Sequence, residues 1–372
     1  MKAIKFSVAN IKNSHIRDVV KVIKSGWLTH GKFTYLFEKK FKEYTKSKYS
    51  LTVSSCTSGL HLLSLASGFK KGDEVIVPAI SHTATSHAVE YTGAKVIFCD
   101  VEFPSGNISL EKIKKKITKK TKGIIIVHMA GYPCNVIEIS KFCKKKKLIL
   151  IEDCAHAIGT KLNNIHVGNF GVGGSFSFYP TKQITTGEGG MIVVNDKGLY
   201  KKIKRLKQFG IDKDITDRKR QGEYDVVELG YNYRMTDFQS SLGYNQLKIY
   251  KNNLKKRLEI AKRYIRNFKN QKKIIFTKYS KNCSYFVFQI FCSSRNSLLD
   301  YLKENKVGVS VHYMKPLPTM KYYKDKYKLN IKNFKNSKRY SESNISLPIY
   351  PKLSFKEVDK ISNIINKFVN AK

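Results

Sequence analysis

The chain has 372 residues, of which 41% are hydrophobic and 12% aromatic, so it can bury a sizeable core and is not an intrinsically disordered protein. Its formal net charge is +42, because 70 basic residues face 28 acidic ones. Such a charge favours nucleic-acid or anionic-membrane partners, but only ten of the basic residues are Arg, which reads bases and phosphates bidentately. The charge runs through the whole chain without a zinc-finger or RNA-recognition pattern, so we interpret it as a compositional bias toward Lys and expect no specific nucleic-acid partner.

The cysteines and the apolar runs indicate in which cellular compartment we expect the protein. Seven Cys are scattered along the chain without a C-x-x-C pair or a Cys/His cluster at zinc spacing, so we expect reduced thiols, no disulfide framework and no metal site. Residues 1–20 contain no apolar stretch typical of a secretory signal. The longest apolar runs have the length of a strand, not of a membrane span. The sequence therefore predicts a cytoplasmic protein without membrane insertion.

The elements of the first half alternate between helix and strand. Residues 10–45 carry apolar positions at helical spacing and predict helices. Short apolar runs then alternate with helical stretches up to about residue 195, which predicts a mostly parallel central sheet flanked by helices. The predicted strands are 50–55, 73–79, 94–101, 122–129, 147–153, 174–180 and 189–196.

The second half has a different pattern. Residues 197–270 are expected to be mostly helical. Strands are predicted at 285–291 and 307–314 with a helix between them, and a capping box of Ser354 and Glu357 begins the last helix. We therefore expect an α/β protein with a large domain, residues 1–250, which includes the N-terminal helical segment, and a small C-terminal α/β domain, residues 251–372.

Polar residues follow several of the predicted strands, at the edge where ligands bind in open α/β sheets. Thr57 and Ser58 open a helix after the first strand, where hydroxyls and backbone N–H groups can bind phosphate or simply cap the helix. Asp153 ends the strand 147–153, and His156 follows it. A carboxylate at that place can cap the next helix or hold a proton on a heteroaromatic nitrogen.

Two further stretches belong to the same edge. Lys182 follows the strand 174–180 and precedes a Gly-rich turn, without charged neighbours. A desolvated amine has a lowered pKa and can attack aldehydes, although an ordinary lysine would be solvated. The stretch 230–243 presents Asn232 and Arg234 in a turn before a helix capped by Thr236, or it is only a surface loop. A phosphate site, a strand-end Asp and a sheltered Lys are together the parts that pyridoxal phosphate (PLP) requires.

The sequence resembles the DegT/StrS family of PLP-dependent nucleotide-sugar aminotransferases, and the resemblance runs nearly end to end. It is carried most specifically by IEDCAHA (151–157), SFYPTK…GEGG (177–190) and GYNYRMTD (230–237), in this order. The resemblance implies the aminotransferase fold type I, PLP as cofactor and an obligate homodimer with shared active sites.

Roles for single residues follow from the resemblance. Lys182 would form the internal aldimine and move the proton, Asp153 would pair with the pyridinium nitrogen, and His156 would lie near the phenolic oxygen of the cofactor. His82 would stack on the ring, although a core or capping role stays open. The expected phosphate ligands are Thr57, Ser58, Ser177 and, from the other subunit, Asn232. The expected substrate contacts are Thr29, Tyr179, Arg234, His312 and Tyr313, with Lys315 as a further candidate.

Two positions depart from the family pattern. Cys56 stands where the family usually has Gly, before the phosphate-binding Thr. Pro318 stands where many members have a His that touches substrate, which weakens the transfer of substrate contacts from this loop.

The resemblance also implies a reaction. L-Glutamate would donate an amino group to a nucleoside-diphosphate-linked keto-6-deoxy sugar, in a pathway such as bacterial surface polysaccharide synthesis. The stretch 185–188 (TTGE) favours the 4-keto position over the 3-keto position, which more often accompanies a GDGG-type stretch. A non-catalytic regulatory or binding member stays an alternative, but it would be expected to lose Lys182, Asp153 or Asn232, and all three are present.

Overall fold

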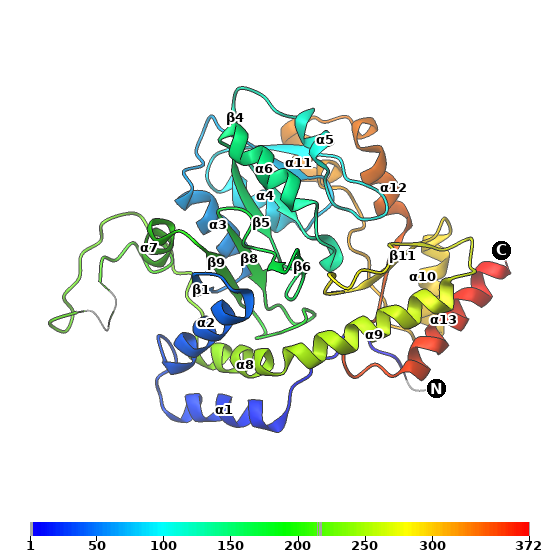
Figure 1. Ribbon diagram of the computed structural model, residues 1–372, viewed down its shortest axis with the longest axis horizontal. Coiled ribbons are helices and arrows are strands. Elements are labelled where there is room, and N and C mark those ends of the chain that lie inside the picture. The colour runs from blue at the N-terminus through cyan, green and yellow to red at the C-terminus, as the bar shows by residue number, and fades with distance from the viewer. Residues whose placement is uncertain (1–2, 214, 216–217, 372) are drawn as a thin grey trace.

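The computed structural model describes residues 3–213, 215 and 218–371, and a seven-stranded sheet forms the centre of this part (Figure 1). Its strands are β1 (Tyr49–Val53), β2 (Glu74–Pro78), β3 (Lys95–Cys99), β4 (Thr121–Val127), β5 (Ile149–Asp153), β8 (Gly173–Ser177) and β9 (Gly190–Val194). They lie in the order β1-β9-β8-β5-β4-β2-β3. All neighbours from β8 to β3 are parallel, whereas β9 is antiparallel to both β1 and β8. The predicted strands are confirmed, and the sheet is mostly parallel as expected.

Apolar side chains cover both faces of this sheet, which is why its strands read as continuous apolar runs. In β2, for example, Val75 and Val77 point into one core cluster, while Ile76 between them points into another. The helices on the first face are α3 (Cys56–Ala66), α4 (Thr83–Glu90) and α7 (Lys197–Leu206). Those on the second face are α2 (Lys32–Thr45), α5 (Leu110–Lys114), α6 (Val136–Lys146) and α8 (Asp237–Lys248). Helix α1 (Asn13–Lys24) packs on α8 (Figure 1).

The last part of the chain builds a second, smaller core around a three-stranded sheet. Its strands are β10 (Ile275–Phe276), β11 (Phe288–Phe291) and β12 (Asn344–Leu347). Its helices are α9 (Tyr250–Phe268), α10 (Arg295–Glu304), α12 (Lys335–Ser343) and α13 (Phe355–Asn370). Helix α9 runs from the large sheet to the side of α13 (Figure 1). The Ser354–Glu357 capping box begins α13 as predicted.

The boundary between the two predicted domains, at residue 250, stays a prediction. It coincides with the start of α9, yet segments from each side cross it. Ile4 pairs with Val307 and packs in the smaller core. Conversely Leu317, in the turn η3 (Leu317–Thr319), and Tyr323, in helix α11 (Lys321–Tyr327), pack in the core of the large sheet.

One sequence prediction about elements is wrong. Residues 307–314 form no strand, because this segment makes only isolated bridges, from Val307 to Ile4 and from Ser310 to Ser346. The third strand of the small sheet is β12 instead. Residues 197–270 are mostly helical as predicted, in α7, α8 and α9. The described residues between α7 and α8 form mainly turns and isolated bridges, with the Val227 N–H donating to the Gly210 carbonyl at 3.0 Å.

Four short elements complete the description: β6 (Lys161–Leu162), β7 (Ile165–His166), and two 3₁₀ turns, η1 (Met129–Gly131) and η4 (Ile331–Phe334). Among the residues described, no helix has both the length and the apolar character needed to cross a bilayer.

Candidate active site

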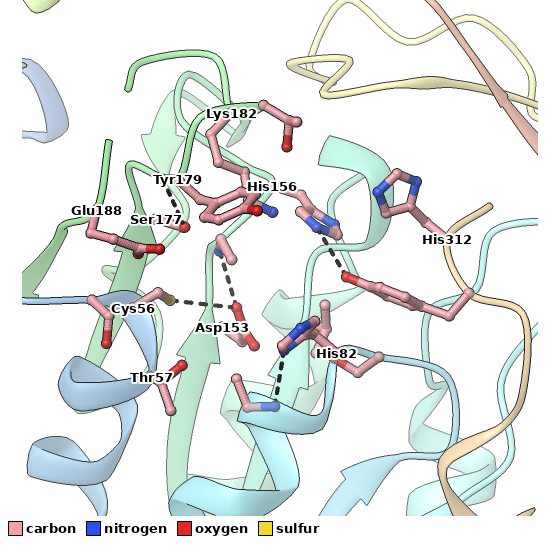
Figure 2. A pocket seen from close by; sticks show the side chains of 17 residues that line it. Cys56, Thr57, His82, Asp153, His156, Ser177, Tyr179, Lys182, Glu188 and His312 are labelled. Carbon is pink, nitrogen blue, oxygen red and sulfur yellow. Dashed lines mark hydrogen bonds between the residues drawn. The ribbon is translucent and has the colours of Figure 1, made fainter. Parts of the chain in front are cut away.

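A cavity of ≈ 410 Å³ lies at the carboxyl ends of β5 and β8, between the N-termini of α3 and α4 (Figure 2). Its size is typical of small-molecule sites. The residues that line it are Ser55, Cys56, Thr57, Ser81, His82, Ala84, Val127, Asp153, Ala155, His156, Ser177, Tyr179, Thr181, Lys182, Glu188, His312 and Tyr313. The structure thus brings together nine of the thirteen predicted site residues, which come from segments more than 250 residues apart.

Asp153 is delivered to the cavity by the last position of β5 and is only 4% exposed. Its Oδ2 accepts a hydrogen bond from Thr85 Oγ1 of α4 at 2.7 Å, and its Oδ1 accepts from the Ala155 N–H at 3.0 Å. The Cys56 thiol lies 4.0 Å from Oδ1 (Figure 2). The Asp153 carboxylate is therefore held by contacts from three segments of the chain. It lies in the wall of the cavity, where it can accept a hydrogen bond from the N–H of a heteroaromatic ring.

The preceding residue, Glu152, points to the opposite face of the sheet and has a structural role. Its carboxylate accepts backbone N–H bonds from Gly168, Phe170 and Gly171 at 2.7–2.9 Å, and His128 Nε2 lies 3.1 Å away. The nearby Cys154 completes a cluster with metal-ligand atoms, but the carboxylate oxygens are already taken by these donors. We therefore assign no metal to this cluster.

Lys182 is a different kind of lysine from the solvated ones elsewhere in the chain. Its side chain is half-buried, and its Nζ lies 4.3 Å from the centre of the Phe286 ring. Burial lowers its pKa from 10.5 to about 8, although the Cys56 and Asp153 side chains oppose this shift. The amine is thus partly uncharged near neutral pH, as a nucleophile toward an aldehyde must be.

His156 forms one wall of the cavity in a single defined tautomer. Its ring stacks on Phe286 at 4.4 Å and 16°. Nδ1 accepts a hydrogen bond from the Ala130 N–H at 3.3 Å, so in the neutral ring Nε2 carries the proton, 3.3 Å from the Tyr313 hydroxyl. Burial, together with Lys182, keeps the pKa of His156 well below its usual value, so the ring stays neutral.

Another wall of the cavity is the segment of His312 and Tyr313, which residues of β11 and β12 hold in place. The His312 N–H donates to Asn344 Oδ1 at 3.1 Å, its carbonyl accepts from Gln289 Nε2 at 3.1 Å, and its Nδ1 lies 2.9 Å from Ser346 Oγ. Burial lowers the pKa of His312 to about 3. This segment is therefore a fixed, uncharged surface rather than a loose loop.

The N-terminus of α3 forms an anion-binding cup next to Asp153. The helix is capped by Ser55, not by Thr57 or Ser58, since Ser55 Oγ accepts from the Ser58 N–H at 3.0 Å. Thr57 and Ser177 line the cavity, and the Ser177 hydroxyl accepts a hydrogen bond from the Tyr179 N–H at 3.4 Å, which leaves its own O–H free to donate. The Ser58 hydroxyl instead donates to the Ser55 carbonyl at 2.7 Å inside the capping box and does not line the cavity, so its role as a phosphate ligand stays a prediction.

Gly190 allows the cup to form. A Cβ at this position of β9 would lie 2.6 Å from the carbonyl carbon of Ser55 and 2.7 Å from the Cys56 nitrogen. The absence of a side chain therefore lets β9 lie directly under the loop whose N–H groups and hydroxyls form the cup.

His82 caps a helix and also lines the cavity, so its stacking on a cofactor ring stays a prediction. It is the N-cap of α4, where its Nδ1 accepts from the Ala84 N–H at 3.2 Å. Its ring nevertheless faces the cavity, 6.1 Å from the ring of Tyr313 (Figure 2). The capping bond fixes the plane of the imidazole, so capping does not compete with stacking on a planar ligand.

The remaining predicted residues lie outside this cavity. Asn232 is exposed and its backbone pairs with Gln208, while Thr29 is exposed and pairs with Thr236. Arg234 lines a separate depression with Trp27 and stacks on Phe209 at 5.0 Å. Within one chain these three residues do not line this cavity, so the contacts expected for them, including that of Asn232 with the site of the other subunit, stay predictions.

Sequence reasoning missed several residues that shape the cavity: Ser55, Thr85, Glu188 and Phe286. Ser55 precedes the first helical residue, so the general rule for N-caps could have found it. Thr85 and Phe286 carry no local signal, because their roles depend on contacts with Asp153 and His156 that are distant in sequence.

The fold and the cavity define a PLP-dependent aminotransferase of fold type I. The chain is 37% identical over 364 residues to GDP-perosamine synthase from Escherichia coli O157:H7, and the aligned region covers 95% of each chain. It is 34% identical over 378 residues, 98% of each chain, to the UDP-4-amino-4,6-dideoxy-N-acetyl-beta-L-altrosamine transaminase of Campylobacter jejuni. The solved structure of Helicobacter pylori PseC, an aminotransferase of pseudoaminic acid biosynthesis, matches with a TM-score of 0.92 and 30% identity over 100% of both chains. Residues 9–366 match the DegT/DnrJ/EryC1/StrS aminotransferase family, and the chain belongs to this family.

Proposed function

We propose that the protein transfers an amino group from L-glutamate to a nucleoside-diphosphate-linked 4-keto-6-deoxy sugar, with PLP bound in the cavity of Figure 2. The observation that carries the proposal is the half-buried amine of Lys182, with a pKa of about 8, in the same cavity as a fixed carboxylate and an anion-binding cup. Similarity to enzymes named for nucleotide-linked amino sugars supports the substrate class.

The donor set of the cavity fits the cofactor. The N-terminus of α3, with Thr57 and Ser177, would hold the phosphate, because free N–H groups and hydroxyls at a helix start favour a dianion. Asp153 would accept the proton of the pyridine nitrogen. His82 would lie against the ring. When bound there, PLP supplies an electron sink for the carbon that loses or gains a proton.

Lys182 would act twice. As a neutral amine it would hold the cofactor covalently, and once released by an amino substrate it would move a proton between substrate and cofactor carbons. Its lowered pKa suits both steps, since a base titrating near the working pH both accepts and returns a proton readily. The Phe286 ring beneath Nζ limits the positions the amine can take.

His156 and Tyr313 would orient the cofactor without carrying charge. The Nε2–H of His156 can donate to the phenolic oxygen that the resemblance places beside it, because Nδ1 is occupied by the Ala130 N–H. A neutral donor at this point supports a developing negative charge without neutralising it. The pKa of Tyr313 is raised by burial, so its hydroxyl also stays protonated.

A homodimer with shared active sites is part of the proposal. Asn232 and Arg234 lie outside the chain's own cavity, on a segment that exposes the large apolar side chains of Val226, Val227 and Leu229, the last of them 83% exposed. Apolar side chains exposed together suit an interface. In the dimer, Asn232 would reach the phosphate of the partner's cofactor, and the depression with Arg234 would help to form the substrate site.

The preference for the 4-keto position rests on the stretch 185–188 and on the relatives named for 4-amino sugars. A 3-keto sugar aminotransferase stays the alternative. The test is a reaction with ¹⁵N-labelled L-glutamate and GDP- or UDP-linked 4-keto-6-deoxy sugars, with NMR of the product. We expect ¹⁵N on C4 and no product with Lys182→Ala. The corresponding 3-keto-6-deoxy sugars are tested in parallel. Incorporation of ¹⁵N at C3 of those sugars without turnover of the 4-keto sugars, or turnover by Lys182→Ala, would contradict the assignment.

A further inference from the structure

A second concave surface lies on the small domain, away from the cofactor cavity. It is a groove of ≈ 600 Å³ between α12, the end of β11 and the β10 strand. Its lining residues are Phe103, Lys272, Lys273, Ile275, Phe291, Cys292, Ser293, Lys335, Lys338, Arg339, Glu342 and Ser343. None of them lines the cavity that holds Lys182.

The charge in the groove is concentrated and only partly neutralised. Lys335, Lys338, Arg339 and Glu342 follow one another at i, i+3, i+4 and i+7 and therefore lie on one face of α12. Glu342 is the single acidic residue of the lining, and it pairs with Lys338 at 3.9 Å. The ammonium groups of Lys335 and of Lys272, across the groove, have no acceptor among the described residues.

Arg339 is oriented before any ligand arrives. The central carbon of its guanidinium lies 3.9 Å from the centre of the Phe103 ring, and its side chain makes no hydrogen bond within the described part of the chain. This contact restrains the guanidinium while its N–H groups keep no acceptor among the described residues, and a guanidinium fork matches the oxygens of a phosphate. Side-chain entropy that would oppose binding has thus already been lost on folding.

Arg295, two residues after the groove residue Ser293, is a buried donor that does not itself line the groove. It is 7% exposed, and neither its Nε nor its Nη1 has a partner in the described structure. Burial lowers the pKa of Arg295, and the negative charge of the groove residue Glu342 opposes this shift. Arg295 is the first residue of α10, whose N-cap Ser294 makes no side-chain cap, and the groove residue Ser293 directly precedes that cap. A buried cation without hydrogen-bond acceptors destabilises the folded state, and a bound anion would supply such acceptors.

From this arrangement we infer that the groove binds the phosphate or diphosphate group of a small molecule, with Arg339 as the fork and Lys272 and Lys335 as flanking charges. The Lys-rich composition does not explain the site, since Arg339 and Arg295 are two of only ten arginines in the chain. The concave shape and the apolar walls of Phe291 and Ile275 favour a compact ligand over an extended nucleic-acid strand. The inference does not depend on the proposed amino transfer.

The test is calorimetric titration of the PLP-loaded full chain with inorganic pyrophosphate at 150 mM NaCl. Loading with PLP keeps the phosphate cup of α3 filled. The variants are Arg339→Ala and the double variant Lys272→Ala/Lys335→Ala. A matched control, Lys144→Ala/Lys145→Ala, removes two exposed lysines of α6 that do not line the groove.

We expect saturable binding to the wild-type chain that weakens about tenfold or more in both groove variants, because a charge-assisted hydrogen bond is lost, and that the control leaves unchanged. Aminotransferase activity of the groove variants should stay at the wild-type level. Absence of saturable binding, or an equal loss in the control, would overturn the inference. Binding that tightens with the length of an RNA oligonucleotide and ignores Arg339→Ala would show a general polyanion surface instead.

Discussion

Replacement of Lys182 by Met should stabilise the cofactor-free protein at neutral pH. The pKa of this lysine falls from 10.5 in the unfolded chain to about 8 in the fold, mainly because its surroundings exclude water. A shift of one unit corresponds to 1.36 kcal/mol, so keeping the ammonium in place costs the folded state up to about 3 kcal/mol at pH 7. Met has a similar length and no charge, and it can pack on Phe286 in the same position.

The sign of the pH dependence is part of the prediction. Since the folded pKa is the lower one, the unfolded chain binds the extra proton between about pH 8 and 10.5, and stability rises with pH in that window. The gain in the free energy of unfolding that Lys182→Met gives over the wild-type protein should therefore be largest below pH 8. It should fall to less than half of that value by about pH 9.5.

The assay is urea unfolding of PLP-free protein at one fixed chain concentration, at pH 7 and pH 9.5, because dimerisation would make stability depend on concentration. Lys144→Met is the control, since this lysine is exposed on α6. Equal stability of the Lys182→Met and wild-type proteins at pH 7 would refute the argument that the amine is desolvated. So would a gain that persists unchanged at pH 9.5.

Four other outcomes can be checked. Asp153→Asn should keep the fold but lower kcat about 100-fold or more, and an unchanged rate would mean that the carboxylate does not meet the cofactor. His156→Gln should leave the shape of the kcat–pH profile between pH 6 and 8 as it is, since burial already keeps the imidazole neutral; a lost inflection there would show a titrating histidine. Gly190→Ala should raise the Kd for PLP, measured by fluorescence titration, about tenfold, because its Cβ would clash with Ser55; an unaltered Kd would contradict the role of the cup. Asn232→Ala should weaken PLP binding while sedimentation equilibrium still gives a mass of two chains, and unchanged affinity would place Asn232 outside the partner's site.

The residues at strand ends were predictable because their roles follow from local rules. Asp153 and Lys182 each follow an apolar run, and the carboxyl ends of parallel strands meet at one edge of a sheet. The antiparallel direction of β9 was not predicted, since continuous apolar runs of this length do not reveal strand direction. This direction nevertheless brings Gly190 under the phosphate cup.

The parts that could not be predicted depend on contacts between distant segments. The apolar alternation of residues 307–314 is that of a strand, but the chain uses Val307 to bind the N-terminal Ile4 and places His312 in the cavity. The pairing that replaces it is made by Asn344–Leu347, a segment with few β-branched residues. Likewise the Phe286 ring contacts both Lys182 and His156, and no pattern in the sequence around Phe286 indicates these contacts.

The most direct test of the account is the absorption spectrum of the purified, PLP-supplemented chain before and after addition of L-glutamate, beside Lys182→Ala. The account predicts a visible band of covalently bound cofactor in the wild-type protein, its replacement by the near-ultraviolet band of the pyridoxamine form on addition of glutamate, and no such covalent band in the variant. A wild-type band that ignores glutamate would contradict the proposed donor. The same band in Lys182→Ala would contradict the role of this lysine, on which the whole assignment of the cavity rests.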